Sequence, residues 1–78
     1  MNKKEFYRKL QMANLHGKKI AVCWRIYCVL EMRRGMEDQL SKANLMKLAN
    51  ITNWSMMLKR LVDMVNAGII TDTWEIVE

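Results

Sequence analysis

The chain has 78 residues, a formal net charge of +5, and apolar residues at half of its positions. This length is enough for one small domain and not for two. Because the first 20 residues are charged and no apolar run reaches about 18 residues, we expect neither a signal peptide nor a membrane-spanning helix. The chain contains no proline, which favours a mostly helical fold.

The positive charge is concentrated in the first half of the chain. Residues 1–35 carry nine of the 13 lysines and arginines and only two of the eight acidic residues, whereas residues 36–78 are slightly acidic. A basic half suits an anionic partner such as nucleic acid. A solvated, lysine-rich surface explains the same pattern equally well, so both interpretations stay open.

The residue types that support catalysis or metal binding are scarce. Cys23 and Cys28 would point about 140° apart on a helix, so they are expected to remain free thiols in a reducing cytoplasm. His16 is the only histidine, and the three glycines are scattered rather than gathered in a phosphate-binding loop. We therefore expect no metal, no cofactor and no enzymatic activity.

Residues 1–17 are predicted to form an N-terminal helix and a turn, with Phe6, Leu10 and Ala13 on one apolar stripe. Residues 18–34 are ambiguous, because their apolar residues fit both the helical spacing and the alternation of a strand. We favour a central helix, since two arginines followed by Gly35 are typical of a helix end.

Residues 41–67 are predicted to form two helices joined by a tight turn. Ser41 and Thr52 are the expected N-caps, because their hydroxyls can accept from unpaired backbone N–H groups. In the first helix, Leu45, Leu48 and Ala49 should face inward. In the second, residues 53–67, six residues spaced three and four apart are expected to share the buried face: Trp54, Met57, Leu58, Leu61, Met64 and Val65.

Residues 69–78 are predicted to form a short β element after Gly68, which should end the second helix. Ile69 and Ile70 would start one strand, a turn at 72–73 would follow, and residues 74–77 would return. Of the three tryptophans, Trp24 and Trp54 are expected in the core, and Trp74 over its open end.

The segments "LSKANLMKLANIT" and "NWSMMLKRLVDMVNAGII" resemble the first helix plus turn, and the recognition helix plus start of the wing, of the winged helix-turn-helix family. The resemblance covers residues 20–78. It implies a mainly α fold of about four helices with a short C-terminal β element, in a single winged helix-turn-helix-like domain over residues 1–78.

The resemblance also implies a site for double-stranded DNA. The exposed residues of helix 53–67 would enter the major groove, and two lysines of the preceding helix would approach the phosphates. Asn53 would read adenine, and Lys59 or Arg60 would contact guanine or phosphate. The implied DNA-binding residues are Asn53, Ser55, Met56, Lys59, Arg60, Lys42 and Lys47.

The resulting hypothesis is a small cytoplasmic transcriptional regulator, small enough to be phage-borne. The alternative is a protein-interaction module or inhibitor, or a homodimer, that uses the same fold without DNA. Two departures from the family pattern motivate it. Trp54 and Met56 occupy positions that are usually polar, and the expected wing carries Asp72, Glu75 and Glu78, which would repel phosphate.

Overall fold

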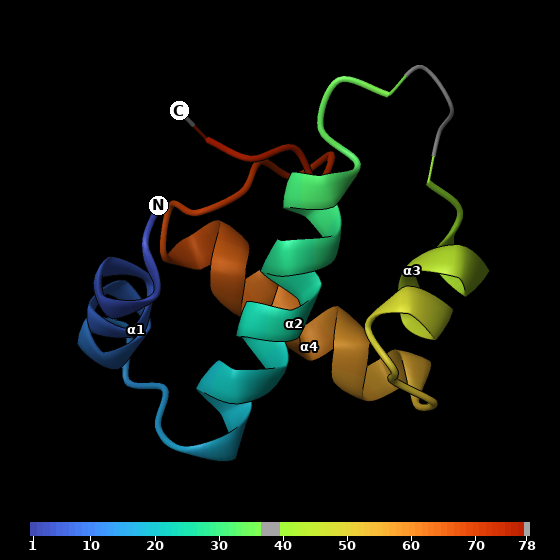
Figure 1. Ribbon diagram of the computed structural model, residues 1–78. Coiled ribbons are helices and arrows are strands. Elements are labelled where there is room, and N and C mark those ends of the chain that lie inside the picture. The colour runs from blue at the N-terminus through green and yellow to red at the C-terminus, as the bar shows by residue number, and fades with distance from the viewer. Residues whose placement is uncertain (37–39, 78) are drawn as a thin grey trace.

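A computed structural model describes residues 1–36 and 40–77, and four α-helices lie within them. The central helix α2 has α1 on one side and α3 on the other, and α4 crosses behind it (Figure 1). The mainly helical fold predicted from the sequence is thereby confirmed. The helices are α1 (Lys3–Met12), α2 (Lys18–Met32), α3 (Lys42–Leu48) and α4 (Trp54–Asn66).

An aromatic cluster joins α1 to α2. The ring of Phe6 has no exposed surface, and its centroid lies 5.0 Å from those of both Trp24 and Tyr27. Leu10 is also buried, as predicted, but Ala13 is exposed and Leu15 enters the core instead. The reason is local: α1 ends at Met12, and the backbone turns at Asn14, which has a positive φ of 67°.

The ambiguous segment is a helix, α2, and not a strand. Residues buried in the core occur along most of its length, which explains why its sequence pattern fitted two periodicities. Gly35 adopts a φ of 80° just beyond the helix, in agreement with the predicted stop. The buried residues are Ile20, Cys23, Ile26, Tyr27 and Val29.

Helix α3 starts as predicted but faces the core differently. The Ser41 side chain accepts from the N–H of Asn44 at 3.1 Å and so caps the helix. Leu45 is fully buried, whereas Leu48 is 50% exposed, so its prediction as a core residue was wrong. Ala49 is buried as predicted, and Ile51 is buried as well, just after the chain reverses at Asn50, whose φ is 55°.

The N-cap of α4 is Asn53 and not Thr52. The Asn53 side-chain oxygen accepts from the N–H of Met56 at 3.0 Å, and the helix begins at the next residue, Trp54. Both residue types are good N-caps, so the sequence alone could not separate two adjacent candidates.

This assignment predicts unequal effects of two neighbouring substitutions. Asn53→Ala should lower the free energy of unfolding by about 1 kcal/mol, because it removes the cap bond. Thr52→Ala should change it by less than about 0.5 kcal/mol, since Thr52 is an exposed residue outside the helix. Urea denaturation of both variants measures the difference, and an equal or larger loss for Thr52→Ala would contradict the assignment.

The C-terminal segment folds back on itself without forming a strand in the part of the chain that the structure describes. The prediction was a short β element over residues 69–78, of which Glu78 lies outside the described residues. In its place, the described part of this segment has a single antiparallel bridge, between Ile70 and Ile76. Ile69 and Ile70 are buried in the same hydrophobic cluster as the helices. The segment therefore closes one end of the core.

Candidate nucleic-acid interface

Helix α4 has one face in the core and the opposite face in solvent. Met57, Leu61 and Met64 are buried, with at most 1% of their surface exposed. At 100° per residue, these three residues define one side of the helix. On the other side, which we call the outward face, five residues are exposed: Ser55, Leu58, Lys59, Val62 and Asn66.

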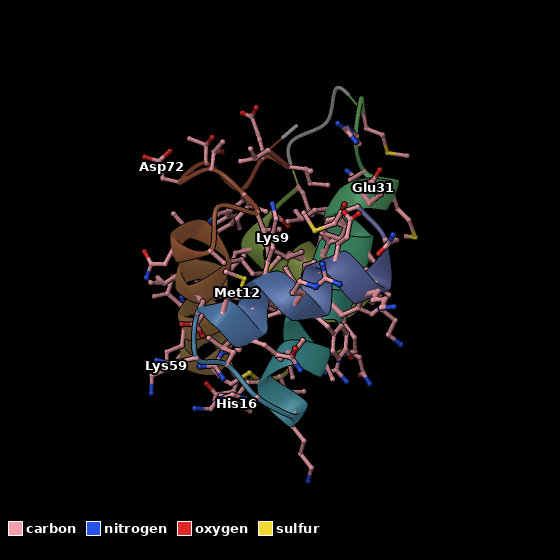
Figure 2. All side chains as sticks on the ribbon, turned by 90° about the vertical axis from the view of Figure 1, so that its left-hand side faces the viewer. Lys9, Met12, His16, Glu31, Lys59 and Asp72 are labelled. Atoms are coloured by element: carbon pink, nitrogen blue, oxygen red, sulfur yellow. The ribbon has the colours of Figure 1, made fainter. Side chains whose placement is uncertain are left out.

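Two of the predicted DNA-binding residues belong to this outward face. Ser55 and Lys59 are both exposed. Figure 2 shows Lys59 at the edge of the molecule, beside α4, while Lys9 of α1 lies near the middle of the same view. The lysine is therefore free to approach a large partner such as a duplex.

Arg60 and Met56 do not fit the predicted role. Only 12% of the Arg60 side-chain surface is exposed, and its Nε lies 3.0 Å from Oδ2 of Asp63, in ion-pair contact but without an aligned hydrogen bond. Met56 is half-buried and packs against the core. Both residues flank the buried side of α4, because they lie 100° or less from a core position on the helix. Both side chains are therefore less accessible than a groove-reading role requires.

Asn53 is exposed, but half of its amide already has a partner. Its side-chain oxygen caps α4 by accepting from Met56, which leaves the amide NH₂ and the second lone pair of that oxygen for another partner. Reading adenine through an asparagine needs the donor and the acceptor together. The predicted adenine contact would therefore have to share the oxygen that caps the helix.

The two lysines of α3 are exposed, as a phosphate-contacting role requires. Nζ of Lys42 lies 4.3 Å from the centroid of the Trp54 ring, a cation–π contact that joins the starts of α3 and α4. Trp54 in turn contacts Trp74, with ring centroids 5.9 Å apart. Lys47 lies in the last turn of α3, where a cation also stabilises the helix.

The segment after α4 is neutral or acidic where it reaches solvent. Asp72 and Glu75 are exposed, and the Thr71 hydroxyl accepts from the backbone N–H of Glu75 at 3.1 Å, which holds the turn. Trp74 has a positive φ of 64°, unusual for a bulky residue, and its ring packs on Trp54. The turn therefore offers carboxylates, rather than cations, to its surroundings.

Sequence reasoning missed the apolar part of the outward face. Leu58 was predicted to be buried, yet it is 42% exposed, and Val62 is 50% exposed. Together with Lys59, they line a shallow hollow that extends to the Arg60–Asp63 ion pair. The i, i+4 spacing of Leu58 and Val62 was the available signal, but the stronger stripe of Met57, Leu61 and Met64 obscured it.

The buried thiol of Cys23 is not a reactive group. Burial raises its pKa to about 12, so it is protonated at neutral pH. Its Sγ lies 3.9 Å from the backbone oxygen of Arg60, which places it between α2 and α4. Cys23 therefore serves as a small packing residue.

No family model, curated protein or solved structure matches the chain. Within residues 1–36 and 40–77, no helix has the length and apolar character needed to cross a membrane. The same residues contain no group of three or more His, Cys, Asp or Glu side chains placed to hold a metal ion.

Proposed function

We propose that the chain binds double-stranded DNA as a small winged helix-turn-helix-like transcriptional regulator, with α4 in the major groove. The observation that carries the proposal is the division of α4 into a buried face and an exposed outward face, directly after a short capped helix and a tight turn. A helix-turn-helix protein needs its second helix anchored on one side and free on the other.

The distribution of charge supports this orientation. Lys59 is exposed on the outward face, and Lys42 and Lys47 are exposed on α3. The one acidic residue of α4, Asp63, is paired with Arg60. Contacts from these exposed lysines of α3 and α4 to phosphates would contribute a salt-dependent part of the affinity.

The C-terminal segment does not add to this attraction. Its exposed Asp72 and Glu75 would repel phosphates, so the wing of this proposed domain would stay clear of the DNA backbone.

The free cysteines, Cys23 and Cys28, suit a reducing cytoplasm, where a regulator of transcription would act.

Replacing Lys59 tests the proposal. A contact from Lys59 to guanine would contribute about 1–3 kcal/mol, so Lys59→Gln should weaken duplex binding by roughly 5- to 150-fold. A contact to phosphate instead should lower the salt dependence of log K by about one unit. Fluorescence anisotropy with a labelled duplex selected from a random-sequence pool, at 50 and 200 mM salt and with unlabelled competitor, measures both.

The matched control is Lys9→Gln, which removes the same charge from α1. It should weaken binding much less than Lys59→Gln, since Lys9 belongs to a different helix, α1. Equal losses for the two variants would mean that net charge alone attracts DNA, and would remove α4 from the interface. Absence of binding by the folded protein at 50 mM salt would overturn the proposal as a whole.

The second candidate is a protein-interaction module, which the exposed apolar residues favour. Leu48, Leu58 and Val62 are each at least 42% exposed on α3 and α4. Such residues suit a protein partner or a second copy of the chain. Analytical ultracentrifugation of the chain alone tests whether two copies associate. A dimer that the substitution Leu58→Lys converts to monomer, together with no affinity for DNA, would favour this candidate.

A further inference from the structure

The outward face of α4 has an unusual composition for a surface that meets an anion. Of its five exposed residues, only Lys59 is charged, and Leu58 and Val62 are aliphatic. Leu58 and Val62 are four residues apart, so their Cβ atoms lie about 6 Å from each other on the same side of the helix. The two form an apolar pair beside the single cation (Figure 2 labels Lys59).

The major groove offers one apolar feature to such a pair. Hydrogen-bond donors and acceptors dominate the base edges there, and the only methyl group is the C5-methyl group of thymine. An aliphatic side chain facing any other base would remove water from polar groups without replacing their hydrogen bonds. The chemistry of the outward face therefore selects thymine.

We propose that Leu58 and Val62 bind thymine methyl groups in the major groove, and that Lys59 beside them binds a guanine or a phosphate. This inference rests on the proposed DNA binding and specifies its preferred sequences. Because base pairs are stacked 3.4 Å apart, a pair of side chains about 6 Å apart spans about two base-pair steps. The preferred site therefore contains thymines at neighbouring or next-neighbouring positions.

Deoxyuridine provides the test, since it differs from thymidine only by the missing methyl group. Duplexes selected from a random-sequence pool are resynthesised with uracil in place of thymine, and both forms are titrated with the full chain. Removing one buried methyl group should weaken binding about fourfold, and removing two about 15-fold. The double variant Leu58→Ser, Val62→Ser should bind the two forms equally.

Met12→Ser is the matched control, because Met12 is an apolar residue that is 82% exposed on α1. It should retain the preference for thymine. Circular dichroism checks that each variant is folded, and the exposure of Leu58 and Val62 makes folding of the double variant the expected result.

The outcomes separate this inference from the proposed function. DNA binding with equal affinity for the thymine and uracil duplexes would overturn the methyl contact and leave DNA binding intact. A thymine preference that survives in the double variant would overturn the assignment to Leu58 and Val62. Failure of the folded chain to bind either duplex at low salt would overturn both proposals together.

Discussion

Phe6→Ala is expected to lower the free energy of unfolding by about 3–5 kcal/mol. The Phe6 ring has no exposed surface and contacts two further rings, Trp24 and Tyr27, so alanine would leave a cavity between α1 and α2. Small domains have total stabilities near the lower end of about 5–15 kcal/mol. The variant should therefore be largely unfolded at moderate temperature, with a melting temperature lower by at least about 12 °C.

Thermal and urea denaturation followed by circular dichroism and tryptophan fluorescence measure this loss. Fluorescence is informative because Trp24 contacts Phe6 directly. Met12→Ala is the control on the same helix, since Met12 is almost fully exposed and should change stability by less than about 0.5 kcal/mol. A loss below about 1 kcal/mol for Phe6→Ala would mean that α1 does not pack on α2 as described.

The helices themselves were predictable, because strong local signals mark them. Phe6 and Leu10 gave the spacing of α1, Ser41 gave the start of α3, and Gly68 followed the end of α4 with a positive φ of 75°. Each of these signals depends on a few neighbouring residues and on backbone geometry alone. The helix at residues 18–32 was less certain, because a helix buried on several sides loses its periodicity.

The rotation of each helix about its axis was harder to predict. Leu48 and Leu58 are as apolar as the core residues Leu45 and Leu61, and nothing in their own side chains marks them as exposed. Which leucines are buried depends on how far the reversal at Asn50 turns α4 relative to α3, a tertiary property. For the candidate site, this rotation decided which predicted residues were exposed.

The site prediction was incomplete for the same reason. Lys59 is exposed, while Arg60, the next residue, is largely covered and paired with Asp63. Both residues were predicted to be surface cations, because long basic side chains are usually solvated. The i, i+3 spacing of Arg60 and Asp63 allows an ion pair on a helix. That this pair lies beside the buried face, where it covers Arg60, becomes clear only when the buried face of the helix is known.

Two leucines of α4 test this rotation directly, because Leu→Ala removes the same atoms at each position. Leu61 is 1% exposed and packs in the core, so Leu61→Ala should lower the free energy of unfolding by about 2–5 kcal/mol. Leu58 is 42% exposed, so Leu58→Ala should lower it by less than about 1 kcal/mol. Urea denaturation of the two variants gives the comparison.

The difference between these two variants reports burial alone, because the gain in helix propensity from leucine to alanine is common to both. A larger loss at Leu58 than at Leu61 would place the outward face in the core and would remove the surface on which the proposed DNA contact depends. With the expected order, Leu58→Ala is a folded protein in which duplex binding can be measured, so stability and recognition separate on a single helix.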